Sequence, residues 1–173
     1  MLRGLVLLCG VLVLARGETT QVEQCQVHAG SLPINTLVVG CEVPPCVLPQ
    51  LQDVVVQIIF RAPYQIREMR TLATAYLATV LGTVPVPYPL GSDALTCNFL
   101  DNTYCPIVEG EVIQYTLRMY IESFFAAGTQ ASIEFRVVDD DNVPMICIRV
   151  PIRIVEPDPS RSGNQNATIT VEV

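Results

Sequence analysis

Four stretches of this 173-residue chain carry apolar side chains at every second position, and this alternation limits the fold more than any other feature. Successive side chains of a β-strand point to opposite faces, so a period of two places one face against a core. The pattern predicts half-buried antiparallel strands. The apolar sets are Val54, Val56, Ile58 and Phe60; Ile113, Tyr115, Leu117, Met119 and Ile121; Ile133, Phe135 and Val137; and Ile146, Ile148, Val150, Ile152 and Ile154.

Residues 66–81 are ambiguous by composition. Their alanine, leucine and methionine would suit a helix, whereas Thr74, Tyr76 and Thr79 favour a strand among β neighbours, so we predict a strand. Residues 34–39 are a further candidate strand. Turn-forming residues separate these segments, and nothing has the spacing of βαβ units. About seven short strands in one domain predict an all-β, antiparallel two-sheet sandwich.

The two ends of the chain differ from its middle. Residues 1–17 have a basic residue, an apolar run and small residues near their end that suit cleavage after Gly17, the pattern of a secretory signal peptide. Residues 18–155 form the predicted domain. Residues 156–173 are polar and proline-broken, predicting a flexible tail that carries a glycosylation sequon at Asn166. Residues 167–173 alternate again, so an edge strand there remains an alternative.

Six of the seven cysteines lie beyond the predicted signal peptide. An even number in an exported chain predicts three disulfides, although six cysteines permit fifteen pairings. A zinc site is disfavoured because the chain has one histidine and no CxxC pair. We expect no metal and no cofactor.

The charge is acidic, and every basic residue is an arginine. Without Arg3 and Arg16 the chain has eight basic and seventeen acidic side chains, a net charge near −9. Phosphate binding requires a basic surface, so nucleic acid is excluded as an expected partner. Steady attachment to anionic membranes is disfavoured, while brief contact through an apolar lip remains open.

Catalytic groups are scarce. A Ser/His/Asp or Cys/His arrangement would depend on His28, three residues after Cys25, and a surface or edge histidine is the simpler interpretation. The run from Asp139 to Asp141 lacks the spaced oxygen ligands of a calcium loop and is typical of a hairpin turn. The sequence therefore predicts a protein that is not an enzyme.

The segment VPVPYP, residues 84–89, cannot be a central strand because its three prolines donate no backbone hydrogen bonds. In extended backbone the prolines lie on one side and Val84, Val86 and Tyr88 on the other. The segment is either an edge strand protected by proline or the rigid lip of a binding site.

The motifs CEVPPC (41–46), VPVPYP (84–89) and CNFLDNTYCP (97–106), followed by a last strand with Cys147, together resemble the ML (lipid-recognition) domain family. The resemblance covers residues 22–155 and is closest to the Niemann-Pick type C2 branch, with the group 2 mite allergens more distant. It implies an immunoglobulin-like β-sandwich with an apolar cavity between the sheets. It also implies the pairs Cys25–Cys147, Cys41–Cys46 and Cys97–Cys105. Because Cys147 shares the polar face with Arg149, the first bridge should lie outside the core.

Carried onto this chain, the resemblance implies a lipid pocket whose mouth is formed by Val84, Val86 and Tyr88, with Ile121 and Phe125 opposite. The walls would come from Val54, Val56, Ile58, Phe60, Leu117, Phe135, Ile148 and Val150. The implied function is a secreted, monomeric carrier that holds a sterol, or another hydrophobic lipid such as a fatty acid, and transfers it to membranes or acceptor proteins. A lysosomal lumen is a further possible location. The alternative is an innate-immune or receptor-accessory module with a filled core, recognising a microbial glycolipid or a protein.

Overall fold

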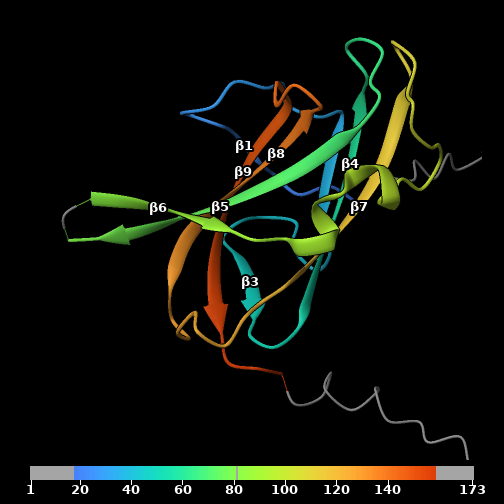
Figure 1. The fold of residues 1–173 in the computed structure, drawn as a ribbon. Coiled ribbons are helices and arrows are strands. Elements are labelled where there is room, and N and C mark those ends of the chain that lie inside the picture. The colour runs from blue at the N-terminus through green and yellow to red at the C-terminus, as the bar shows by residue number, and fades with distance from the viewer. Residues whose placement is uncertain (1–17, 81, 159–173) are drawn as a thin grey trace, which may run out of the picture.

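The structure, a computed structural model, describes residues 18–80 and 82–158. The predicted signal peptide, Asn166 and most of the predicted tail lie outside these residues. Within the described residues, nine strands form two sheets, and Figure 1 shows their arrangement. The larger sheet has the order β1-β9-β8-β5-β6 with β3 also paired to β9, and the smaller has the order β2-β4-β7. The strands are β1 (Glu23–Gln24), β2 (Asn35–Val38), β3 (Cys46–Pro49), β4 (Asp53–Arg61), β5 (Met69–Thr79), β6 (Gly82–Tyr88), β7 (Val112–Tyr120), β8 (Gln130–Asp139) and β9 (Pro144–Val155).

Every strand predicted from the alternation is present, and residues 69–79 form a strand rather than a helix. The predicted count of about seven is too low by two, because β1 and β3 are too short to show a period. Both lie along the same edge of the twelve-residue β9: β1 pairs with it antiparallel and β3 pairs with it in parallel. Together they cover an edge that would otherwise expose unpaired backbone groups.

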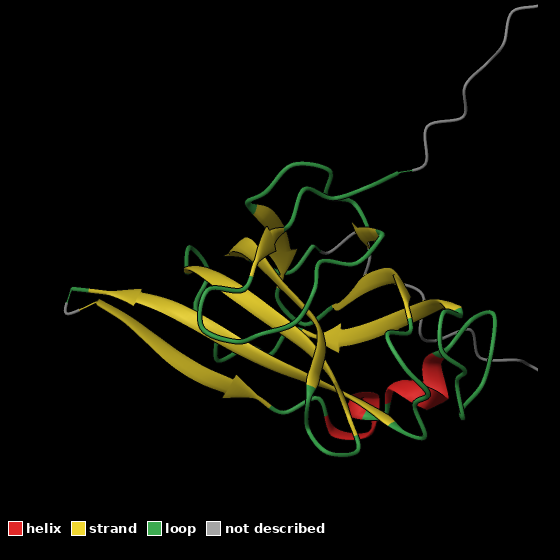
Figure 2. Cartoon of the chain, turned by 90° about the horizontal axis from the view of Figure 1, so that it is seen from above, coloured by secondary structure: helices red, strands yellow, loops and turns green. Residues whose placement is uncertain are grey.

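The β5–β6 hairpin extends beyond the rest of the molecule (Figures 1 and 2). β6 is the edge strand of the larger sheet, as its prolines require, and pairs only with β5. Pro85 and Pro87 lie opposite Tyr76 and Thr74, while Val84 and Val86 lie opposite Leu77 and Ala75. The prolines therefore share the outer face of the sheet, and the valines share the face that turns toward the smaller sheet.

The two sheets pack through the apolar faces that the alternation identifies. Ile58, Phe60, Leu117 and Ile148 are each at most 1% exposed. Burying a side chain of this size stabilises the fold by about 1.5–3 kcal/mol. Two short 3-10 helices, η1 (Gly91–Ala94) and η2 (Thr96–Phe99), cover one end of the interior, and η2 contacts both β5 and β7. No helix within residues 18–80 and 82–158 is long and apolar enough to cross a membrane.

Three disulfides link the cysteine pairs that the family resemblance implies: Cys25–Cys147, Cys41–Cys46 and Cys97–Cys105. The first joins residues 122 positions apart and lies on the outer face of the larger sheet, outside the core between the sheets. Gly30 lets the N-terminal segment lie directly on β9, since a Cβ atom there would be 2.8 Å from Cys147 Cβ. This segment therefore covers the outer face of the sheet.

Candidate functional site

An apolar cavity of about 20 Å³ lies between the sheets, at the end opposite η1 and η2. That volume holds about one water molecule, so side chains fill almost all of the interior. A larger molecule could enter only if the sheets separated or the lining side chains moved. The lining residues are Ala75, Leu77, Tyr88, Met119, Ile121, Phe125, Thr129, Ala131, Ile133, Ile152 and Ile154.

The residues proposed for the lipid pocket fall into three groups. Tyr88, Ile121 and Phe125 line the cavity. A second group is buried in the same core, away from the cavity wall: Val54, Val56, Ile58, Phe60, Leu117, Phe135, Ile148 and Val150. Val84 and Val86 lie outside the lining, and Val84 is 46% exposed.

Most lining residues were not assigned to the pocket from the sequence. Met119, Ile133, Ile152 and Ile154 were predicted to face inward by the same alternation, but they were not assigned to the pocket. Ala75 and Leu77 were missed because residues 66–81, although predicted to be a strand, show no clear alternation that marks an inward face. Thr129 and Ala131 lie where the chain enters β8, and no sequence signal marks them.

An aromatic contact closes the cavity at its mouth. The rings of Tyr88 and Phe125 are 5.9 Å apart between centroids, and those of Phe124 and Phe125 are 4.3 Å apart. The Tyr88 hydroxyl donates to the backbone carbonyl of Tyr120, which joins β6 of the larger sheet to β7 of the smaller. Burial, and then the nearby Glu122 and Tyr120, raise the pKa of Tyr88, so its hydroxyl remains a donor at neutral pH.

The segment that carries Phe125 is also hydrogen-bonded to Gln50, the residue that follows β3. Gln50 Nε2 donates to the carbonyl oxygens of Phe125, at 2.6 Å, and Ser123, at 3.2 Å. Tyr88 and Gln50 therefore hold the two ends of residues 120–125 over the cavity, while Ile121 between them is buried in the core. The mouth is closed by contacts that are individually weak.

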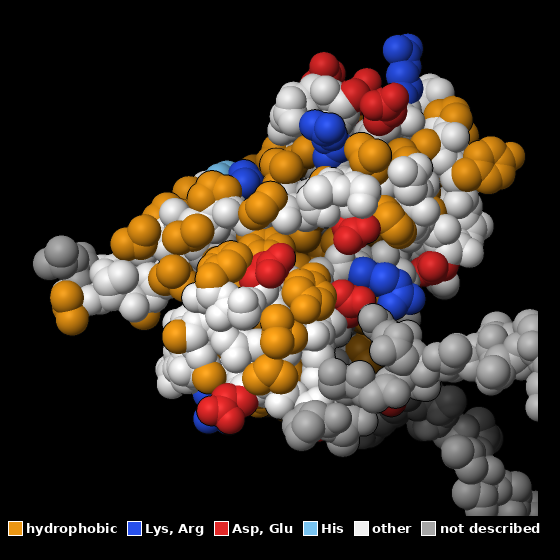
Figure 3. Space-filling model, turned by 60° about the horizontal axis from the view of Figure 1, so that its bottom comes forward, with side chains coloured by type: hydrophobic (Ala, Val, Ile, Leu, Met, Phe, Trp, Pro, Cys, Tyr) orange, Lys and Arg blue, Asp and Glu red, His pale blue; other side chains and the backbone are white. Residues whose placement is uncertain are grey.

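Exposed apolar side chains lie near this mouth and along the β5–β6 hairpin that projects from it. Val80, Val84, Tyr120 and Phe124 are 102%, 46%, 43% and 70% exposed. In the space-filling view, hydrophobic side chains follow the β5–β6 hairpin and continue across the adjoining surface (Figure 3). Such a surface suits brief contact with a membrane or an apolar partner.

A group of three hydroxyls lies between the sheets at the other end of the interior. The Thr71 hydroxyl is 2.8 Å from Thr96 Oγ1 and donates to the Tyr115 hydroxyl oxygen at 2.8 Å. All three residues are at most 1% exposed. Burial raises the pKa of Tyr115 to about 12, although hydrogen bonds from Thr71 and Thr96 act in the opposite direction. We call these residues the hydroxyl triad.

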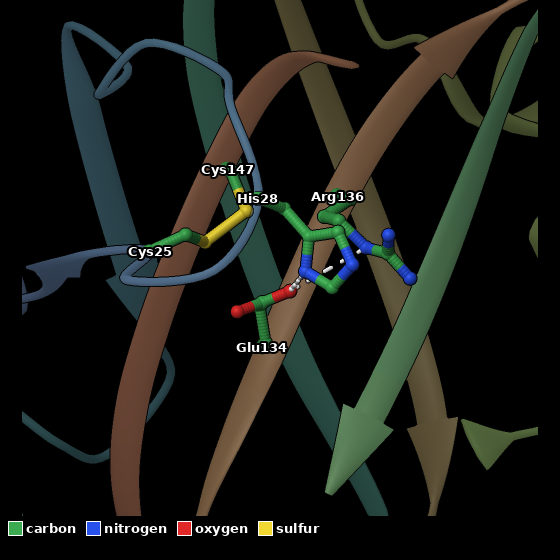
Figure 4. Close-up of polar contacts among 5 residues, drawn as sticks. All are labelled: Cys25, His28, Glu134, Arg136 and Cys147. Atoms are coloured by element: carbon green, nitrogen blue, oxygen red, sulfur yellow. Dashed lines mark hydrogen bonds and ion pairs between the residues drawn. A yellow bond between two sulfur atoms is a disulfide. The ribbon is translucent and has the colours of Figure 1, made fainter. Parts of the chain in front are cut away.

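The outer face of the larger sheet contains a buried carboxylate, Glu134, which is 0% exposed (Figure 4). His28 Nδ1 lies 2.6 Å from Glu134 Oε1, and Arg136 Nε lies 3.5 Å from the same oxygen. The alternation placed Glu134 correctly on the polar face, but that face is covered there by the N-terminal segment. His28, predicted to be a surface or edge residue, is one-third exposed and contacts this carboxylate.

Together with Cys25 and Cys147, Glu134 forms the only group of three possible metal ligands in the part of the chain that the structure describes. Both sulfurs form the disulfide and provide neither a thiolate ligand nor a thiolate nucleophile. The acidic run at residues 139–141 is a hairpin turn, as predicted. Asp139 accepts the backbone N–H groups of Asp141 and Val143 at 3.0 and 2.8 Å.

A protein-family model described as the ML domain matches residues 19–154. The chain belongs to the ML domain family. Within the family, NPC intracellular cholesterol transporter 2 of Danio rerio is 27% identical over 115 residues, which are 66% of this chain and 72% of that protein. The crystal structure of a Niemann-Pick type C2 protein from the Japanese carpenter ant matches this ML domain with a TM-score of 0.60. The match has 18% identity and covers 78% of this chain and 98% of that chain. The β-sandwich implied by the cysteine and proline motifs is confirmed.

Proposed function

We propose that this ML domain is a non-enzymatic carrier that takes up one hydrophobic lipid, foremost a sterol, between its sheets. The observation that carries the proposal is the purely apolar cavity that ends at the Tyr88–Phe125 mouth. The Danio rerio relative, named a cholesterol transporter, supports sterol as the first ligand to test. A lipid that buries several hundred Å² at about 25 cal/mol per Å² gains on the order of 10 kcal/mol before ordering costs, so no catalytic group is needed.

The carrier would act as an exported monomer, in the extracellular space or a lysosome-like lumen. The three disulfides support an oxidising compartment. The exposed residues near the mouth and on the β5–β6 hairpin, Val80, Val84 and Phe124 among them, would contact the donor membrane and the acceptor membrane or protein during transfer. That contact would be brief, because the chain's net charge is negative.

The proposal is tested by titrating the protein with dehydroergosterol and following energy transfer from its tyrosines, with mass spectrometry of solvent extracts in parallel. We expect saturation at one sterol per protein and an increase in melting temperature, since a ligand that binds only the folded state stabilises it. If neither sterols nor long-chain lipids bind or raise the melting temperature, the carrier function is rejected.

The 20 Å³ cavity favours one second candidate, an accessory module with a filled core. In that case the exposed residues around the mouth would contact a receptor or a microbial glycolipid without admitting a lipid chain. Binding of such a partner with no uptake of free sterol or alkyl lipid would support this candidate over the carrier.

Changing Tyr88 to phenylalanine tests whether the mouth limits entry. The change removes the hydroxyl that links β6 to the Tyr120 carbonyl but keeps the ring against Phe125. Because one hydrogen bond contributes about 0.5–1.5 kcal/mol, we expect sterol uptake to become about two- to tenfold faster, as measured by stopped-flow fluorescence. Tyr104→Phe, at an 81% exposed tyrosine, is the control and should leave the rate unchanged. Equal rates in all three proteins would show that another contact closes the mouth.

A further inference from the structure

A groove follows β5 along the outer face of the larger sheet, on the side away from the cavity between the sheets. It consists of two adjoining clefts, of about 590 and 570 Å³, that share Thr74. The outward positions of β5 form its floor: Arg70, Leu72, Thr74 and Tyr76. From Arg70 to Tyr76 the floor spans six positions of strand, about 20 Å, and we call this feature the arginine groove.

The groove is bordered by two different parts of the chain. Pro85 and Pro87 of β6 line it on one side, and Val27 and His28 of the N-terminal segment line it on the other. The N-terminal segment is raised above the sheet, because it covers Glu134, an outward residue of β8 (Figure 4). The floor therefore lies in a recess along the strand direction, a shape that suits an extended chain better than a flat surface.

The groove is basic in a chain that is acidic overall. Arg70, Arg136 and Arg149 line it, and none of its lining residues is an aspartate or a glutamate. Within residues 18–80 and 82–158, both ion pairs involve Glu134, so neither Arg70 nor Arg149 forms a salt bridge there. The chain as a whole has a net charge of −7, so this basic strip stands out against its surroundings and attracts a ligand of opposite charge.

Two of the three arginines are held in place before any ligand binds. Arg136 Nε lies 3.5 Å from the buried Oε1 of Glu134, and its terminal nitrogens point away from that carboxylate (Figure 4). The guanidinium of Arg149 lies 4.4 Å from the centre of the Tyr76 ring, and in the described part of the chain its β1 neighbour Glu23 forms no ion pair with it. A guanidinium forms paired hydrogen bonds with a carboxylate, and an ordered side chain loses less entropy on binding. The groove is therefore suited to carboxylates.

The spacing of the arginines matches that of an extended chain. Arg70, Arg136 and Arg149 lie in the rows of the sheet that contain β5 positions 70, 72 and 74. Rows two residues apart are about 7 Å apart, which is also the spacing of alternate side chains in an extended peptide. Carboxylates at alternate residues of a peptide in the groove therefore meet successive arginines.

We propose that the arginine groove docks an extended acidic segment of a partner protein, with carboxylates at alternate residues facing the arginines and the residues between them facing solvent. The groove lies on the face away from the cavity, so docking does not depend on lipid uptake and does not block the Tyr88–Phe125 mouth. A bilayer is the poorer occupant, because a flat surface does not reach the recessed floor and the chain's net charge opposes anionic lipids.

The experiment measures binding of a rhodamine-labelled heptapeptide that alternates glutamate and threonine, with blocked ends, by fluorescence anisotropy at pH 7.5 and low ionic strength. The same peptide with glutamine in place of glutamate tests the need for charge. The proteins are the unchanged chain, Arg70→Gln and Arg149→Gln, with Arg118→Gln as the matched control. Arg118 is an exposed arginine on β7 of the smaller sheet. Arg136 is left unchanged, because its loss would remove a cation from beside the buried Glu134.

We expect the unchanged protein and Arg118→Gln to bind the glutamate peptide at least about tenfold more tightly than the glutamine peptide, and added salt to weaken that binding. Arg70→Gln and Arg149→Gln should each weaken it by about three- to tenfold at unchanged melting temperature. The proposal is overturned if the glutamate peptide does not bind, if both peptides bind equally, or if Arg118→Gln has the same effect as Arg70→Gln. It is also overturned if phosphatidylserine vesicles bind through Arg70 and Arg149 and the peptide does not. Dehydroergosterol titration of the same variants reports on the carrier function separately.

Discussion

Replacing Cys25 and Cys147 together by serine should lower the free energy of unfolding by about 5 kcal/mol, the largest stability loss expected from opening any of the three disulfides. The bond closes a segment of 122 residues, and the chain-entropy model assigns the greatest constraint to the longest loop. The change also releases the N-terminal segment from β9, which exposes the carboxylate of Glu134 and separates it from His28. Urea unfolding of the oxidised proteins measures the difference.

The control is the double serine variant at Cys41 and Cys46, which opens a loop with a separation of 5. The same model gives about 2 kcal/mol for that bond. Equal losses in the two variants would show that loop length does not determine the contribution of these bonds. A change in the slope of the urea transition would instead indicate that the unfolded state has expanded.

Much of the fold could be predicted because apolar and polar residues alternate along a half-buried strand, which identifies its two faces. Ile58, Leu117 and Ile148 follow the period of two and are buried as expected. β3 could not be predicted in this way. It has four residues and depends on pairing with β9, more than 100 positions away in the sequence, so local pattern carries no information about it.

The burial of Glu134 on the polar face of β8 could not be predicted from the local sequence either. Glu134 alternates with Ile133 and Phe135 as an outward residue should, and it does lie on the outer face. Its complete burial comes from the segment around His28, which Cys25–Cys147 attaches to that face. Whether a face meets solvent or another segment depends on long-range contacts that a single strand does not encode.

The sequence identified residues that face the interior, but it did not locate the cavity among them. The alternation identified Ile121 as an inward-facing residue, and the family resemblance added Tyr88 and Phe125. The alternation could not show that the cavity lies beside Ala75 and Leu77, because a filled interior and a hollow interior have the same alternating pattern. The volume depends on the separation of the sheets and on side-chain size at facing positions.

Changing Ala75 to tryptophan should reduce sterol affinity by about 100-fold or more. Ala75 is 5% exposed, lines the cavity and lies between Val86 and Ile133 on the neighbouring strands, so an indole there occupies the space beside the mouth. A 100-fold loss corresponds to about 2.7 kcal/mol, a small part of the apolar free energy that a buried sterol would contribute. Overpacking the core should cost about 1–3 kcal/mol of stability, which thermal unfolding checks.

Ala78→Trp provides the matched control, because it places the same side chain on the same strand but on the exposed outer face. We expect this variant to bind dehydroergosterol as the unchanged protein does. Ala75→Leu adds less volume and should give an intermediate affinity, which separates filling of the cavity from loss of folding. If Ala75→Trp is folded and still binds sterol with unchanged affinity, the ligand does not enter between the sheets, and the accessory module with a filled core becomes the better account of the chain.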